Sequence, residues 1–496
     1  MLYLLADGFA MIFTDPTVIA IMIFGTIGGA IVGALPGITG TMAIVLLLPF
    51  TWHMPPHSAL IMLSSIFIGG MFGGAIPAIL LNTPGSPSAA ATVMDGYPMC
   101  QQGKAGKAIG ICGVADFAGG IFSTFCLILI APQLARIALQ FQSADFFSLS
   151  IFGLSVIASA SGKNVLKGLI AGFFGLMITT VGIDILLGLP RFTFGSWYLM
   201  GGLPMLPVLI GVFAFGQVFS EVGKPPSEVT SMTQKVTGII PNKTEIKGIL
   251  LAIGVGCVVG VFTGVIPGVG GGIACWIAYN VIQKISKNRD KFGTGLPEGV
   301  AAPESANAAN AGGCMIPMLT LGIPGDAQTA VMLGGMIMIG VQPGPLLFTD
   351  HPDVVYSLFA GWISIQFFLL GFGFLFAKFS PNILKLSPRI ILPVVSVLCV
   401  IGAFSLSNSF FHIFIALGFG VIGVFMRKYG YPVAPLILGV ILGPMAESNL
   451  NRALLISGNS LMVFIERPFS LAFLILAAFS IAVPLVKSYL AWRKEA

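Results

Sequence analysis

The chain has 496 residues, of which 56% are apolar and only 8% are charged, whereas soluble chains carry roughly a quarter charged residues. A water-soluble surface cannot be built from this composition, so we expect an integral membrane protein. The formal net charge of +6 comes from lysines and arginines placed in loops, as the positive-inside rule requires, and this placement argues against nucleic-acid binding.

Apolar stretches long enough to span a membrane recur along the whole chain. About 20 residues of helix cross the hydrocarbon core, and we count roughly ten to twelve such stretches. We therefore predict an all-α polytopic membrane protein with about 10–12 transmembrane helices. The clearest predicted spans are 59–80, 108–130, 145–160, 165–187, 203–219, 249–266, 354–376, 390–404, 411–426 and 469–484.

A motif of glycine and proline occurs twice. Residues 33–40 (GALPGITG) match residues 264–271 (GVIPGVGG) at an offset of 231, and residues 82–86 (NTPGS) correspond to 322–326 (GIPGD) at an offset of 240. The extra polar run 284–298 accounts for the difference between the two offsets. We predict two repeat-related halves, 1–220 and 248–496, joined by a polar connector at 221–247 that we expect to be cytoplasmic. The broken segments of these halves are 18–51, 58–94, 249–283 and 303–340.

The loop charges indicate how the halves are oriented. The loop 52–58 has no Lys or Arg, while its counterpart 284–291 has four, and after the second motif the pattern reverses. Inverted topology is the natural inference. A parallel arrangement stays open, because the number of spans between the repeats depends on whether each break is a re-entrant hairpin or an interrupted span.

Each Pro-Gly pair inside an apolar segment should break the helix. Proline lacks the backbone donor and glycine permits a positive φ, and in lipid such a break is tolerated only where protein or a water-filled cavity satisfies the freed groups. The half-helix N-termini at these breaks favour anions, and the exposed carbonyls suit a monovalent cation. The sequence therefore predicts one region with both anion and cation sites.

The predicted substrate-binding residues are the break positions and their neutral polar neighbours: Pro36, Gly37, Thr39, Gly40, Asn82, Thr83, Gly85, Ser86, Pro267, Gly268, Gly270, Gly271, Asn307, Asn310, Pro324, Gly325 and Gln328. Glu304, Asp326 and Thr329 are predicted to bind or relay the cation. Alternatively, the polar residues only cap helices or hold spans together. Asp116 and Asp184 are compatible with membrane interfaces, and Glu447 stays ambiguous.

The run 297–310 (PEGVAAPESANAAN), the two motifs 33–40 and 264–272, Pro317 to Gly325 and the run 342–345 (QPGP) together carry a resemblance. Over essentially its whole length the sequence resembles the large membrane subunit of the tripartite tricarboxylate transporters, the TctA family. The resemblance implies a cation-coupled importer of tri- or dicarboxylates such as citrate in a bacterial inner membrane. It also implies two partners, a small membrane subunit of about four spans and a periplasmic solute-binding protein, with Na⁺ or H⁺ as coupling ion and no other cofactor.

Two other functions are compatible with parts of the sequence. A channel, or a transporter for another small solute, could use the same broken helices. For a membrane-embedded enzyme, the run 322–326 (GIPGD) is a near miss to the Gly-x-Gly-Asp of intramembrane aspartyl proteases, but a Tyr-Asp partner is absent and no Ser/His or metal-ligand cluster replaces it. We expect no enzyme activity.

Overall fold

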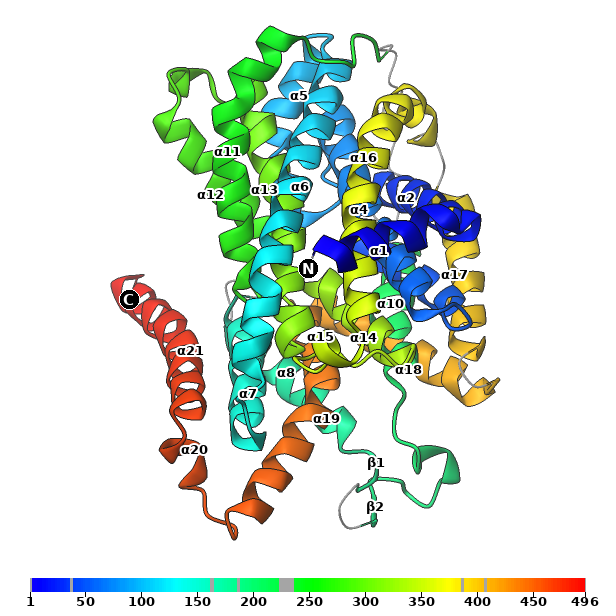
Figure 1. The fold of residues 1–496 in the computed structure, drawn as a ribbon, viewed down its shortest axis with the longest axis vertical. Helices are drawn as coiled ribbons and strands as arrows, with labels where there is room; N and C mark the ends of the chain where they lie inside the picture. The colour runs from blue at the N-terminus through cyan, green and yellow to red at the C-terminus, as the bar shows by residue number, and fades with distance from the viewer. Residues whose placement is uncertain are drawn as a thin grey trace. The chain divides into compact units, whose positions relative to one another are not determined.

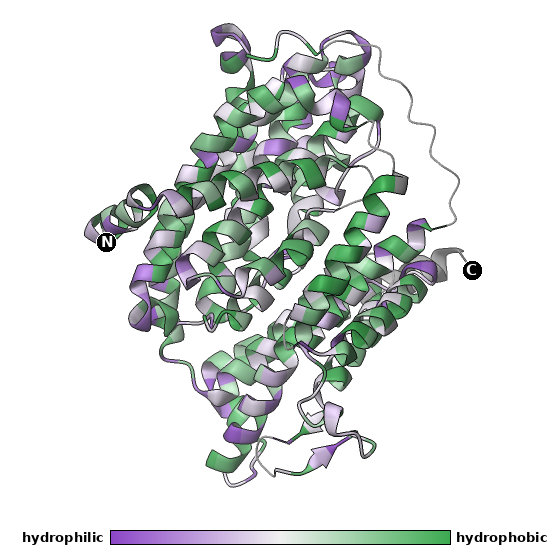
Figure 2. Ribbon diagram, turned by 90° about the vertical axis from the view of Figure 1, so that its right-hand side faces the viewer, coloured by the Kyte–Doolittle hydropathy of each residue, from purple (hydrophilic) through white to green (hydrophobic). Residues whose placement is uncertain are grey.

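The computed structural model describes residues 2–35, 39–160, 165–184, 188–222, 236–384, 388–405 and 408–495. These residues are almost entirely helical (Figure 1), and hydrophobic residues predominate along the helices (Figure 2). Among the described residues, seven helices are long and apolar enough to cross a membrane, and several shorter apolar helices accompany them. The predicted all-α polytopic membrane fold is confirmed.

The helices form two compact units, and the first comprises Met1–Ala135 and Val222–Leu398. It contains α1 (Leu2–Thr14), α2 (Pro16–Ala34), α3 (Gly40–Leu47), α4 (Pro56–Leu81), α5 (Val93–Gln101), α11 (Lys243–Val265), α12 (Gly270–Ile285), α13 (Pro297–Leu321), α14 (Ala327–Met338), α15 (Leu347–Asp350) and α16 (Pro352–Ile383). The 3₁₀ turns η1 (Leu48–Thr51), η2 (Pro87–Ala90) and η5 (Arg289–Lys291) lie between them, and most of α6 (Ala105–Ala138) and α17 (Pro388–Ser405) also belongs here.

The second unit comprises Arg136–Glu221 and Cys399–Ala496. Its helices are α7 (Ser143–Ala160), α8 (Val165–Thr179), α9 (Met205–Leu209), α10 (Gly216–Glu221), α18 (Phe410–Lys428), α19 (Val433–Ile456), α20 (Val463–Glu466) and α21 (Pro468–Glu495). A π-helical turn, η4 (Ile210–Phe215), separates α9 from α10, and the 3₁₀ turn η3 (Trp197–Leu199) follows a two-stranded antiparallel ribbon of β1 (Gly182–Ile183) and β2 (Pro190–Arg191). Each unit takes segments from both halves of the sequence.

Two helices form the centre of the first unit. Every residue of α4 from position 58 to 80 and every residue of α13 from position 299 to 320 is buried. A helix without an exposed face must be surrounded by other helices, and α2 and α6 are among the helices that supply this cover. Polar side chains on α13 are consequently held inside the protein and away from lipid.

Candidate functional site

The first break of each half, at Pro36-Gly37 and at Pro267-Gly268, separates two helices that would otherwise be continuous. In the first half α2 ends at Ala34 and α3 begins at Gly40, where the Thr39 hydroxyl accepts a hydrogen bond from the N–H of Met42 at 3.4 Å. Pro36 and Gly37 lie outside the described residues. In the second half α11 ends at Val265 and α12 begins at Gly270.

Glycine is required at this break in the second half because of its backbone angles. The φ of Gly268 is 82° and that of Gly270 is 64°, a region that other residues rarely adopt. The N–H of Gly268 donates to the carbonyl of Gly325 at 2.7 Å, so the first and second breaks of this half are bonded to each other. Pro267, between the two helices, is buried.

The second breaks also use matching backbone geometry. The helix α4 ends at Asn82 with a φ of 59°, and α13 ends at the equivalent Gly322 with a φ of 71°, so both have a left-handed C-cap. The next element begins at Ser86, which caps η2, in one half and at Asp326, which caps α14, in the other. Asn82 therefore has a structural role as the C-cap of α4, and the neighbouring Thr83 is exposed.

The sequence repeat continues into the packing of the helices. Glycines of α2 lie against α4 at the same repeat positions at which glycines of α11 lie against α13. A Cβ added to Gly29 would be 2.4 Å from the Ile66 carbonyl oxygen, and one added to Gly260 would be 2.4 Å from that of Ala306. The paired contacts join Gly25, Gly29 and Gly33 to Met62, Ile66 and Gly70, and Gly256, Gly260 and Gly264 to Ala302, Ala306 and Asn310.

The two breaks of one half touch at equivalent atoms. A Cβ on Gly85 would be 2.8 Å from the Gly33 carbonyl oxygen, and a Cβ on Gly325 would be 2.9 Å from the Gly264 carbonyl oxygen. The glycines at these four positions therefore allow a close backbone approach. Pro324 beside Gly325 is buried in the same contact region.

The halves also meet each other at their breaks, and they do so reciprocally. The position of a Cβ on Gly40 lies 2.3 Å from Nε2 of Gln328, and the position of a Cβ on Gly271 lies 3.3 Å from the Cβ of Ser88. Gly40 and Gly271 are repeat equivalents, and so are Ser88 and Gln328. The first break of each half thus contacts the residues that follow the second break of the other half.

The chemistry at these equivalent positions is not symmetric. On α13 Asn307 and Asn310 occupy the positions that Phe67 and Gly70 have on α4. The oxygens of both asparagine side chains lie near Gly271, at 3.0 and 3.5 Å from the position of its missing Cβ. At these two equivalent positions, therefore, α13 carries amide side chains and α4 does not.

Asn307 differs from Asn310 in its bonding. The Asn310 amide donates to the Gly260 carbonyl and to the Thr263 hydroxyl, and its oxygen accepts from the Cys314 thiol. Asn307 is 1% exposed, and neither its oxygen nor its nitrogen has a hydrogen-bond partner among the described residues. A buried amide without partners is costly, so it marks a place where a ligand can bind.

The residues predicted to bind a cation fall into two groups. The Asp326 carboxylate accepts from the N–H of Thr329 at 2.8 Å and from its hydroxyl at 2.7 Å, which is a capping box at the start of α14. Glu304 instead lies with Asp116 and Cys112 of α6, and their ligand atoms are within 4.8 Å of one another. Asp116, whose sequence context is compatible with a membrane interface, is buried in this cluster, and its position four residues after Cys112 puts both residues on one face of α6.

A buried carboxylate anchors the polar run that distinguishes the second half. Asp95 on α5 accepts hydrogen bonds from the N–H groups of Gly293, Gly295 and Leu296 and from the hydroxyl of Tyr279. The bonds fix the loop before α13 to the first half of the chain. The polar run is therefore ordered by backbone donors and one phenol.

Three acidic residues in the second unit are paired with arginines. Arg191 lies 3.0 Å from Asp184 and also bonds Glu447, and the hydrogen bond to Glu447 raises the pKa of the Arg191 guanidinium. Arg467 bonds Asp145 at 2.6 Å. Asp184 and Glu447 therefore have a structural role as ion-pair partners of Arg191.

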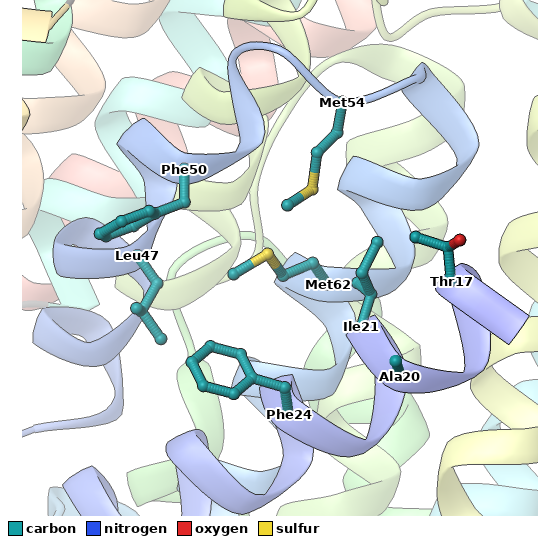
Figure 3. Close-up of a pocket in the computed structure, with 8 residues that line it drawn as sticks. All are labelled: Thr17, Ala20, Ile21, Phe24, Leu47, Phe50, Met54 and Met62. Carbon is teal, nitrogen blue, oxygen red and sulfur yellow. The ribbon is translucent and has the colours of Figure 1, made fainter.

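An apolar pocket lies elsewhere in the first unit (Figure 3). It has a volume of about 320 Å³ and is lined by Thr17, Ala20, Ile21, Phe24, Leu47, Phe50, Met54 and Met62. Thr17 supplies the only polar side chain among these eight residues. This pocket is better suited to bind a hydrocarbon chain than a carboxylate, because burying a charge among apolar side chains is costly. The pocket is therefore a poor candidate for the substrate site.

The sequence is similar to those of known proteins. Residues 19–438 match the tripartite tricarboxylate transporter TctA family. A 52.8 kDa uncharacterized protein of the TAR-I ttuC' 3' region of Agrobacterium vitis is 35% identical over 465 residues, covering 94% of this chain and 92% of that protein. A protein of the TAR-II ttuC' 3' region of the same organism is 34% identical over 222 residues, covering 44% of this chain and 91% of that protein.

No solved structure matches the chain. The family assignment excludes an enzyme, because the matching family is one of transporters, and it implies that further subunits take part. Together with the apolar helices, it makes the chain a multi-pass component of a tricarboxylate transporter. The chain belongs to the tripartite tricarboxylate transporter TctA family.

Proposed function

We propose that this chain is the large transmembrane subunit of a cation-coupled importer of small organic anions, tri- or dicarboxylates such as citrate, in a bacterial inner membrane. Its partners in this proposal are a small membrane subunit of about four spans and a periplasmic solute-binding protein. The observation that carries the proposal is the buried amide of Asn307, which has no hydrogen-bond partner among the described residues and lies beside Gly271 in the first turn of α12.

This arrangement suits a carboxylate for three reasons. The first N–H groups of α12 have no partner within the helix and lie at the positive end of its dipole. Glycines at positions 270 to 272 leave room for a ligand to approach the backbone. The amide of Asn307 can donate to a carboxylate oxygen without placing a permanent charge inside the membrane.

Coupling to cations follows from the energy of moving charge. Moving one negative charge inward against 100 mV, inside negative, costs about 2.3 kcal/mol, so a dianion costs about 4.6 and a trianion about 7 kcal/mol. A substrate of this class accumulates only if cations enter with it. At least two monovalent cations are needed to cancel the electrical cost of a dianion.

We also propose that the two halves are inverted repeats that alternate access to this site. The opposite loop charges favour inversion. The reciprocal contacts of Gly40 with Gln328 and of Gly271 with Ser88 fit a two-fold relation between the halves. Alternating access then moves repeat-related elements around a fixed site.

Transport by the purified system tests the proposal. Proteoliposomes that contain the chain, the small subunit and the purified binding protein are tested with labelled citrate, succinate and malate. We expect one of these to accumulate above equilibrium, and we expect that accumulation to collapse when the Na⁺ and proton gradients are abolished. Entry that stops at equilibrium would indicate a channel, and no entry of any carboxylate would refute the proposal.

A further inference from the structure

Two buried carboxyl groups lie close to each other inside the first unit, and no basic side chain pairs with either of them among the described residues. Asp116 on α6 is 2% exposed and Glu304 on α13 is 0% exposed. The Cys112 thiol donates to Oδ2 of Asp116 at 3.6 Å, and the Thr92 hydroxyl donates to Oε1 of Glu304. The other oxygen of each carboxyl group has no hydrogen-bond partner among the described residues.

The titratable groups around the pair are thiols. Besides Cys112, Cys275 of α12 lies nearby, and its thiol donates to the carbonyl of Pro303. Among the described residues, no lysine, arginine or histidine bonds Asp116 or Glu304, and the ion pairs of the first unit join Lys107 to Glu245 and Arg289 to Asp290. Two ionised carboxylates this close in a buried site repel each other, so the pair retains at least one proton.

A metal cation fits this cluster less well than a proton. Na⁺ requires several hard oxygen ligands, but the third member of the cluster is a soft thiol whose proton is directed at Asp116. A proton needs no such ligand set, because a single carboxylate oxygen can hold it, and each carboxyl group has one oxygen without a partner among the described residues. The chemistry of the donors therefore favours H⁺.

The pair is placed to sense the substrate. Glu304 and Asn307 are three residues apart on α13, so they lie one turn apart on the same side of the helix. An anion bound at Asn307 makes a negative charge on Glu304 less favourable and therefore favours protonation of the pair. By linkage, protonation of the pair must favour anion binding equally.

The helix α4 carries no acidic residue at the position equivalent to Glu304. The repeat equivalent of Glu304 is Ser64, whose hydroxyl accepts a hydrogen bond from Nε1 of Trp362 at 2.8 Å. The described residues thus contain one acidic site of this kind, and its Glu304 lies on the same helix as Asn307 and Asn310.

We propose that Asp116 and Glu304 form a coupling site of the transporter and carry one of the cations that accompany each substrate anion, a proton taken from water on one side of the membrane and released to the other. The inference rests on the proposed function. Both carboxyl groups are sealed from water in this conformation, so proton exchange requires the conformations that alternate around the site.

The test compares driven uptake with exchange in proteoliposomes that hold the chain with its partner subunits. The variants are Asp116→Asn and Glu304→Gln, and Asp290→Asn in the exposed loop is the matched control. Labelled citrate is added while the buffer outside the vesicles is shifted from alkaline to acidic pH. Under this pH gradient, we expect wild type and the control to accumulate citrate without Na⁺. Both pair variants should lose at least tenfold in this accumulation but keep citrate counterflow, which needs no net proton movement.

A direct measurement keeps the inference testable if the variants do not insert. A pH-sensitive dye inside wild-type vesicles should report acidification when citrate is added in Na⁺-free buffer. Accumulation that follows a Na⁺ gradient and ignores a pH gradient, or pair variants that respond to the pH gradient like wild type, would overturn the proton site. If wild type transports none of the tested carboxylates, the proposed function fails instead.

Discussion

The side-chain oxygen of Asn307 lies 3.0 Å from the position that a Cβ atom on Gly271 would occupy. Gly271→Ala should therefore place a methyl group where we expect the substrate carboxylate to bind. We expect citrate uptake to fall at least about tenfold, which corresponds to about 1.4 kcal/mol, with unchanged insertion. Gly254→Ala on α11 is the control, because nothing lies within 4 Å of its added methyl group. Equal uptake by both variants would show that the space beside Asn307 is not used.

The two asparagines of α13 should respond oppositely to replacement by alanine. Asn307 has no partner among the described residues, so Asn307→Ala should not lower the midpoint of thermal unfolding in detergent. It should weaken carboxylate transport by about ten- to a hundredfold, since a hydrogen bond to a charged group contributes about 1.5–3 kcal/mol. Asn310→Ala removes bonds to Gly260 and Thr263 and should lower the unfolding midpoint. A lower midpoint for Asn307→Ala would mean that its amide has a structural role.

Much of this site could be predicted from sequence, because proline and glycine act locally. The breaks, the offsets of 231 and 240 and the polar character of Asn307 needed only the chain itself. The pairing of Asp116 with Glu304 could not be predicted, since 188 residues separate them and only helix packing brings α6 against α13. The structural roles of Asp184 and Glu447 could not be predicted either, because their ion pairs with Arg191 form only in the folded chain.

The Asp95 carboxylate should control the order of the loop before α13. In Asp95→Asn one acceptor oxygen becomes an N–H₂ group that faces backbone donors such as the N–H of Gly293. We expect a loss of about 2 kcal/mol or more, because hydrogen bonds to a charged acceptor are lost and buried donors are left unpaired. The measurements are the thermal midpoint and the rate of tryptic cleavage after Lys291, which should rise.

Asp290→Asn is the control for this loop. Its side chain is 92% exposed, so neutralising it changes the loop charge without removing a buried contact. Trypsin sensitivity equal to that of Asp95→Asn would indicate that charge, and not the buried carboxylate, orders the loop.

Inversion of the halves predicts that equivalent loops lie on opposite sides of the membrane. His53 follows the first break of one half, and Asp290 lies in the corresponding loop of the other. Single His53→Cys and Asp290→Cys variants are made in a background with Cys126→Ser, because the other six native cysteines are buried. An impermeant thiol reagent should label position 290 only from the cytoplasmic side and position 53 only from the other. Both positions should react in permeabilised membranes, which controls for access, and labelling of both from one side would require a parallel repeat.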